Sequence, residues 1–256
     1  MISLVLVRYV LTAAVRDKLL MAVVAIIGLG VCLSLVLSSS AVIEQDQFAV
    51  VYTASSLRLL GLMGLSLFVV FFVRRSFDAR DIEFLLSRPV SRATLISSNA
   101  CAFSLLALGA GLLLAVIVGA IGWHSGQPEG LALWITGVIC EYVLIVNVAL
   151  FFAMVLSSPV TAGMAVMGFY VLARMIGELL GITQSQPYHF MGVEILNGAM
   201  QIVSMIVPRL DLMTQTSWIL YGTGGVADYV FLLAQTGAFI LLVLVAALID
   251  LARRQF

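Results

Sequence analysis

The chain has 256 residues, of which 62% are hydrophobic and only 10% are charged. An average soluble domain is about 45–50% apolar and about 25% charged, so this composition excludes an ordinary soluble enzyme. It predicts an integral membrane protein, because lipid is the solvent that can cover so much apolar surface. Thirteen Lys and Arg residues balance thirteen Asp and Glu residues, so no overall field attracts nucleic acid, and we expect no nucleic-acid partner.

The N-terminal segment, residues 1–18, mixes apolar residues with Arg8, Arg16 and Lys18. It lacks a short basic region followed by a small-residue cleavage site, so we expect it to be retained rather than removed as a signal peptide. The pattern fits a helix that lies at the cytoplasmic interface and then turns into the membrane. We call this expected element the elbow helix.

Six stretches are long and apolar enough to cross the membrane, which requires about 20 mostly apolar residues. They are Leu19–Leu37, Leu57–Val73, Leu95–Trp123, Leu131–Leu156, Pro159–Leu180 and Val226–Leu251. Little chain is left for a soluble domain. We therefore predict an all-α integral membrane protein with six transmembrane helices, in a single domain that covers residues 1–256.

The basic residues predict the orientation of these spans. Ten of the thirteen fall on one side of the membrane, namely Arg8, Arg16, Lys18, Arg74, Arg75, Arg80, Arg88, Arg92, Arg253 and Arg254. The alternate connections are poor in Lys and Arg. Because cytoplasmic segments near the spans carry the positive excess, we expect both termini in the cytoplasm.

The connection between the second and third spans, residues 74–95, reads RRSFDARDIEFLLSRPVSRATL and is the most highly charged stretch of the chain. Ser76 or Asp78 is expected to cap a short helix over 76–88, and Pro89 prevents its continuation. Ser91 is then expected to cap the third span. The residue types favour two interpretations equally, a solvated loop resting on the bilayer and a helix that docks a partner protein.

A stripe of small residues follows the third span, with Ala107, Gly111, Ala115 and Gly119 recurring every four residues. Small residues at this spacing let another helix approach closely. We therefore assign the stripe to helix packing.

Four ionisable residues lie within the predicted spans, namely Arg58, Glu141, Arg174 and Glu178. Each costs at least about 2.5–3.5 kcal/mol inside the membrane and needs a partner. Arg174 and Glu178 are one helical turn apart and are expected to pair, whereas Glu141 has no charged neighbour in sequence. These residues are candidates for a translocation pathway or its gate, and the alternative is an ion-pair cluster that fixes helix packing.

The outer segment 181–225 is too long for a tight turn, and its stretches Val193–Val207 and Leu212–Tyr221 are apolar. Irregular backbone exposed to lipid is forbidden, so two short re-entrant helices are expected before the last span. His124 and His189 lie in outer connections without metal-ligand spacing, and we expect no metal site.

Together these features resemble the membrane subunits of type-two ABC exporters, of the short six-span kind. Members of that family commonly carry a run like E-x-L-L-x-x-P-V-S-R after the second span, and this chain has Glu83-Phe84-Leu85-Leu86-Ser87-Arg88-Pro89-Val90-Ser91-Arg92. The elbow helix and the run Val207-Pro208-Arg209-Leu210-Asp211-Leu212, which looks like the family's proline-containing signature, extend the resemblance over the whole chain.

The resemblance implies a permease of a bacterial or archaeal cytoplasmic membrane that works as a dimer, with a second copy or a homologous permease. Its helix over 76–88, the coupling helix, is implied to dock a separate ABC ATPase present in two copies. The implied contact residues are Asp78, Arg80, Asp81, Glu83, Phe84, Leu85, Leu86, Arg88 and Arg92.

The chain has no phosphate-cradling GxxxxGK[ST] loop, because its only lysine, Lys18, has no preceding glycines. We therefore expect a transport subunit that is not itself an enzyme and holds no cofactor. ATP and Mg²⁺ belong to the partner ATPase, and a periplasmic accessory protein is compatible with the family. The alternative function is a membrane sensor or scaffold that docks the same ATPase, for signalling or periplasmic enzyme maturation, without bulk cargo flux.

Overall fold

The computed structural model describes residues 3–38, 45–78, 91–122, 127–184, 207–222 and 225–253. Within these residues the regular structure is entirely helical. The elements are α1 (Leu4–Arg16), α2 (Lys18–Ser38), α3 (Gln45–Asp78), α5 (Arg92–Ile121), α6 (Pro128–Val155), α7 (Pro159–Gln184), the 3₁₀ turn η1 (Leu210–Leu212), α9 (Ser217–Tyr221) and α10 (Val226–Arg253).

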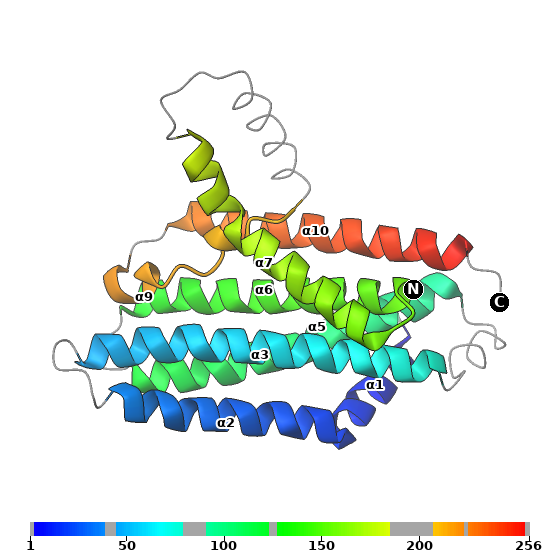
Figure 1. Ribbon diagram of the computed structural model, residues 1–256, viewed down its shortest axis with the longest axis horizontal. Coiled ribbons are helices and arrows are strands. Elements are labelled where there is room, and N and C mark those ends of the chain that lie inside the picture. Colours follow the sequence, from blue (N-terminus) through cyan, green and yellow to red (C-terminus); the bar gives the residue numbers. More distant parts are fainter. Residues whose placement is uncertain are drawn as a thin grey trace.

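The long helices form a bundle around α6. Figure 1 shows α2, α3, α5, α6 and α10 running along the long axis, with α7 crossing them obliquely. α6 packs against α3, α5, α7, α9 and α10. In its most apolar window 72% is buried, compared with 17% for α10. α6 is therefore the core of the bundle, and α10 is an outer helix that leaves most of its apolar surface for lipid.

Five helices in the described part of the chain are long and apolar enough to cross a membrane: Ala49–Phe77, Arg92–Ile121, Pro128–Val155, Pro159–Gly177 and Val226–Arg253. They overlap the second to sixth predicted stretches. This supports the prediction of a membrane protein with several spanning helices. The helices also continue beyond the predicted boundaries, as when α3 begins at Gln45 rather than Leu57. Polar residues at the ends of an apolar stretch extend the same hydrogen-bonded helix, so hydropathy alone underestimates its length.

α2 covers the first predicted stretch with 21 residues. Among its described side chains the continuous apolar part is Val23–Ser34. α2 packs along α3, and Ser34 and Thr53 join the two helices through a buried hydrogen bond between their hydroxyl groups.

α1 is a separate helix, set at an angle to α2 (Figure 1). The chain bends at Asp17, which has an extended conformation with φ −77° and ψ 129°. Val7, Val10 and Ala14 are buried on the face that contacts α5, whereas Leu4 and Val5 on the other face are exposed. The expected helix within residues 1–18 is therefore present.

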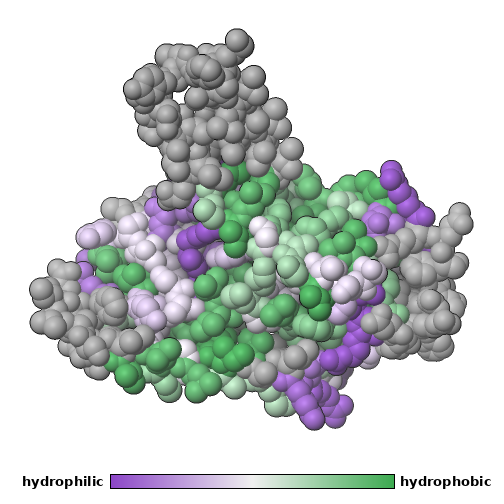
Figure 2. Space-filling model, in the orientation of Figure 1, coloured by the Kyte–Doolittle hydropathy of each residue, from purple (hydrophilic) through white to green (hydrophobic). Residues whose placement is uncertain are grey.

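Basic side chains collect at one end of the bundle, which we call the basic end. The two chain termini lie there in Figure 1, where α3 ends and α5 begins. The described basic residues of these elements are Arg8, Arg16, Lys18, Arg74, Arg75, Arg92 and Arg253. Figure 2 shows hydrophilic residues at this end, an apolar surface over the middle of the bundle, and a smaller hydrophilic patch beside α7.

Two arginines tie helix ends together at the basic end. Arg75 Nη1 lies 3.1 Å from Asp17 Oδ2, at the bend between α1 and α2. Arg92 Nη1 donates to the carbonyl oxygens of Leu251 at 2.7 Å and Ala252 at 3.2 Å. Because the last carbonyls of a helix lack partners within it, Arg92 caps the end of α10.

The caps around the predicted coupling helix are partly as expected. Ser91 caps α5 as predicted, because its side chain accepts a hydrogen bond from Thr94 N at 3.1 Å. Residues 76–78 instead form the last turn of α3, and Ser76 Oγ donates to Phe72 O within that helix. Ser76 is therefore not an N-cap, since α3 continues through it. Most of the predicted coupling helix, residues 79–88, lies outside the described residues.

The segment before α10 is less regular than expected. Instead of one apolar helix over Leu212–Tyr221 it contains η1 and the five-residue α9. α9 ends at Gly222, whose φ of 62° lies in the left-handed region that glycine adopts without strain. Within the expected first re-entrant stretch, Val193–Val207, only Val207 lies in the described part of the chain.

Candidate functional site

Three charged side chains from three different helices meet inside the bundle: Arg58 on α3, Glu141 on α6 and Arg174 on α7. Arg58 Nε lies 3.9 Å from Glu141 Oε2, and Arg174 Nη1 lies 3.9 Å from Glu141 Oε1. The Glu141 side chain is fully buried, thirteen residues after the start of α6 and fourteen before its end. Two cations therefore flank a carboxylate at the middle of the core helix.

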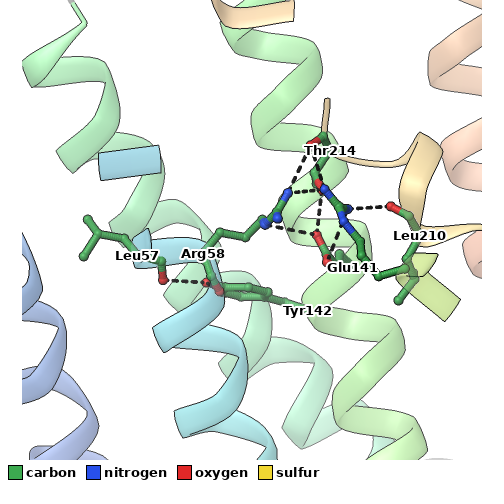
Figure 3. A network of polar contacts seen from close by, with 7 residues as sticks. Leu57, Arg58, Glu141, Tyr142, Leu210 and Thr214 are labelled. Atoms are coloured by element: carbon green, nitrogen blue, oxygen red, sulfur yellow. Dashed lines mark hydrogen bonds and ion pairs between the residues drawn. The ribbon is translucent and has the colours of Figure 1, made fainter. Parts of the chain in front are cut away.

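Thr214, from the irregular segment before α10, joins all three of these residues (Figure 3). Its hydroxyl donates to Glu141 Oε2 at 3.0 Å and accepts from Arg174 Nη1 at 2.7 Å and from Arg58 Nη1. A hydroxyl group has one donor and two acceptor positions. All three are used here, so Thr214 is a fully satisfied centre of the network.

The two arginines also satisfy carbonyl groups of the irregular segment. Thr214 O accepts from Arg58 Nη1 at 3.0 Å and from Arg174 Nη2 at 3.3 Å, and Leu210 O accepts from Arg174 Nη1 at 2.6 Å. Backbone carbonyls outside a helix need a partner when neither water nor a ladder supplies one. Arg58 and Arg174 thus balance the buried carboxylate and stabilise non-helical backbone at the same time.

Glycines in α6 and α7 let this segment approach closely. A β-carbon at Gly137 would overlap the carbonyl oxygen of Met213, and one at Gly130 would overlap that of Trp218. On α7, a β-carbon at Gly177 would overlap the carboxylate of Asp211. The backbone of the segment therefore lies directly against α6, and its Asp211 side chain lies against α7, which brings Thr214 within reach of Glu141.

A hydrogen bond from Tyr142 holds the backbone of Arg58 against α6. The Tyr142 hydroxyl donates to Arg58 O at 2.9 Å and is fully enclosed between α3 and α6. It occupies the space that Gly61 leaves open, since a β-carbon at Gly61 would overlap it. Figure 3 shows Tyr142 reaching α3 next to Leu57 and Arg58.

A polar pocket of about 500 Å³ lies beside the network. Arg58 and Arg174 form part of its wall, together with Ser55 of α3 and residues of the irregular segment. Its remaining walls include Asp211, whose Oδ2 is held by Arg209 Nη2 at 2.8 Å. The two arginines of the network therefore border open space, whereas Glu141 does not line the pocket.

The structure thus brings together three of the four candidate pathway residues, Arg58, Glu141 and Arg174. The long side chains of the two arginines let them reach Glu141 from two other helices. Glu178 follows Arg174 by one turn on α7, and its side chain lies outside the described residues. The expected pairing of Arg174 with Glu178 stays a prediction.

Of the predicted ATPase contacts, Arg92 is the first residue of α5 and Asp78 is the last residue of α3. Both helix ends lie at the basic end. The side chain of Asp78 and the whole of residues 80–88 lie outside the described part of the chain, and with them Arg80, Asp81, Glu83, Phe84, Leu85, Leu86 and Arg88.

The predicted packing stripe faces α6. Ala107 and Gly111 are buried, and a β-carbon at Gly111 would lie 2.7 Å from Ile139 Cγ1 of α6. Ala115 and Gly119 are half-buried further along α5, and the nearest atom to a β-carbon at Gly119 is Leu131 Cδ2 at 3.9 Å. The close approach of α5 to α6 is therefore centred on Gly111.

The described residues hold no group of three or more His, Cys, Asp or Glu side chains that could bind a metal ion. His124 and His189 lie outside them. Comparisons with protein-family models, with curated proteins and with solved structures gave no match.

Sequence reasoning missed Thr214, Tyr142 and the glycines that accommodate the irregular segment. One signal was available for Thr214. The run Thr214-Gln215-Thr216-Ser217 is polar within a largely apolar chain and follows Pro208. Because buried ionisable groups need hydrogen-bond partners, such a run beside an expected re-entrant segment is a natural source of them.

Proposed function

We propose that this chain is the transmembrane subunit of an ATP-driven exporter of the ABC type. It forms the translocation pathway as a dimer and takes its energy from a separate ATPase chain. The observation that carries the proposal is the run from Glu83 to Arg92, which resembles the ATPase-docking run of type-two ABC permeases. Several long apolar helices support the membrane setting of this run.

In the proposed topology α2 is the first of six spans, α1 is the interfacial elbow helix and the basic end faces the cytoplasm. The positive-inside rule supports this orientation. α3 ends at Asp78 and α5 begins at Arg92, both at the basic end. The run between them therefore joins two helix ends on the side where a cytoplasmic ATPase would dock.

The proposed energy coupling is mechanical. ATP and Mg²⁺ are held by two ATPase chains, and closure of these chains displaces the docked segment of the permease. Packed helices respond to such displacements by switching between two discrete arrangements rather than deforming continuously. The Arg58–Glu141–Arg174 network joins α3, α6 and α7. In the proposed switch, movement of one of these helices changes the contacts among the three side chains.

The test is affinity purification of the full chain from its native cells in a mild detergent, followed by identification of the proteins that come with it. We expect an ABC ATPase at about one copy per permease. The double variant Glu83→Ala and Arg88→Ala should lose the ATPase while its yield in the membrane stays normal. Arg8→Gln is the matched control, because Arg8 is an exposed cation elsewhere at the same end.

Purification of the chain without any nucleotide-binding partner would contradict the proposal. Equal recovery of the ATPase by wild type and by the double variant would contradict the assignment of the contact residues. A recovered ATPase whose hydrolysis responds to the chain, without any flux in reconstituted vesicles, would favour the sensor or scaffold alternative.

A further inference from the structure

The polar pocket beside the buried network has the composition of an anion site. Its wall combines the guanidinium groups of Arg58 and Arg174 with residues that carry hydroxyl groups, Ser55, Thr216 and Ser217. Within the described residues these three hydroxyl groups make no hydrogen bond. A ligand in the pocket would therefore meet two cations, and three hydroxyl groups that make no hydrogen bond within the described residues.

The charges of the described side chains around the pocket do not cancel. Three arginines, Arg58, Arg174 and Arg209, face the two carboxylates of Glu141 and Asp211 in the described part of the site. Asp211 is held by Arg209, and Glu141 is shared between the other two arginines. Among these five described side chains the arginines exceed the carboxylates by one, and the burial of Arg58 and Glu141 makes electrostatic interactions here stronger than in water.

Arg58 supplies the unsatisfied group. Its side chain is only 11% exposed, and within the described residues all its hydrogen bonds are made by Nη1, to Thr214. Nε is buried without a hydrogen-bond partner. Buried polar atoms are nearly always satisfied in native proteins. Nε lies beside Glu141, 3.9 Å from its Oε2, whereas the Nη2 donors of this pocket-lining guanidinium make no hydrogen bond within the described residues and are available to a bound group.

We propose that this pocket binds a phosphate-type oxyanion between Arg58 and Arg174. Guanidinium groups match tetrahedral oxyanions with paired hydrogen bonds, and the hydroxyl groups of the wall can donate to the remaining oxygens. The volume of about 500 Å³ is many times the roughly 30 Å³ of a water molecule, so the phosphate can be carried on a larger molecule. Its source is either a soluble phosphate or the headgroup of a phospholipid.

This site does not rest on ATPase coupling, which the proposed function places at the basic end. It concerns the open pocket that Thr214 and Arg174 line. Failure of the ATPase purification would leave the anion site standing, and the reverse also holds.

The experiment measures the thermal unfolding midpoint of the full chain in lipid-free detergent at constant ionic strength. One arm titrates inorganic phosphate against chloride. The other adds short-chain phosphatidylglycerol, with the matching diacylglycerol as a control that has the same chains without phosphate. A ligand that binds only the folded state raises the midpoint in a saturable way. Saturation by inorganic phosphate identifies a soluble source, and saturation only by phosphatidylglycerol identifies a lipid headgroup.

Two variants make the test specific to the site. Arg174→Gln should weaken phosphate binding at least tenfold, whereas Arg8→Gln, which removes a cation from the basic end, should bind like wild type. Glu141→Gln keeps both arginines and removes the competing carboxylate, so it should bind at least several-fold more tightly. If Arg174→Gln does not fold, the comparison of Glu141→Gln with wild type still tests the proposal.

Three results would overturn the proposal. They are the absence of a saturable shift with either phosphate compound, an equal shift in wild type and Arg174→Gln, and an affinity of Glu141→Gln that is unchanged or lower than that of wild type.

Discussion

Arg58 Nη1 donates a hydrogen bond to Thr214 O at 3.0 Å, although 156 residues separate the two in the chain. This bond attaches the irregular segment before α10 to α3. Arg174 attaches the same residue to α7, and Glu141 attaches it to α6. One threonine therefore connects three helices, and the stability of their arrangement should depend on it and on the carboxylate beside it.

Replacing Glu141 with Ala should strongly destabilise the protein. The change leaves Arg58 and Arg174 close together without the carboxylate that separates them, and removing one member of a buried pair costs about 3–5 kcal/mol. The thermal unfolding midpoint of the purified chain measures the effect. Glu129→Ala is the control, because Glu129 is an exposed acid in the first turn of the same helix. Equal midpoints for the two variants would contradict the prediction.

Replacing Thr214 with Val should cost about 1–3 kcal/mol, because the arginines and Glu141 lose a buried hydroxyl partner while the side chain keeps its shape. Thr214→Ser keeps the hydroxyl group and should stay close to wild type. Denaturation of both variants in the same detergent provides the comparison. If Val were tolerated as well as Ser, the hydroxyl group would not be the centre of the network.

Replacing Gly137 with Ala should displace the irregular segment, because the added β-carbon would overlap the carbonyl oxygen of Met213. Overpacking of this kind costs about 1–3 kcal/mol. Gly168→Ala is the matched control, since nothing lies within 4 Å of a β-carbon at that helical glycine, and alanine stabilises a helix relative to glycine. The two variants should therefore move the unfolding midpoint in opposite directions, and a shared direction would refute the close approach.

The proposed orientation predicts which end of the bundle is labelled from outside the cell. In a background with Cys32, Cys101 and Cys140 replaced by Ser, a membrane-impermeant maleimide should label Gln127→Cys in intact cells. Arg8→Cys should react only after the membrane is permeabilised. Both positions are exposed; Gln127 directly precedes α6, and Arg8 lies on α1. The reverse labelling pattern would invert the topology.

Much of the helical architecture was predictable because hydropathy is a local signal. A stretch of about 20 apolar residues needs no knowledge of the rest of the chain, and the cap at Ser91 follows from its immediate neighbours. The break at Asp17 between α1 and α2 was likewise indicated by the charges of residues 16–18. The ends of α3 were less predictable, since a helix continues for as long as its hydrogen bonds do.

Only part of the site could be predicted from the sequence. That Arg58, Glu141 and Arg174 need partners follows from the cost of burying charge. The identity of those partners depends on which helices pack together, and no local pattern places Thr214 beside Glu141. The glycines of α6 show the same limit, because Gly130 and Gly137 have a role only once a backbone lies across them.

The hydrogen bonds of Arg92 to the end of α10, together with the contact of Arg75 with Asp17, have a mechanical consequence. Residues 79–90 are the covalent connection between two helix ends, and each end also contacts a part of the chain that is remote in sequence. One of these helix ends contacts the bend between α1 and α2, and the other contacts the terminus of α10. A displacement of this short stretch would therefore act directly on the bend between α1 and α2 and on the end of α10.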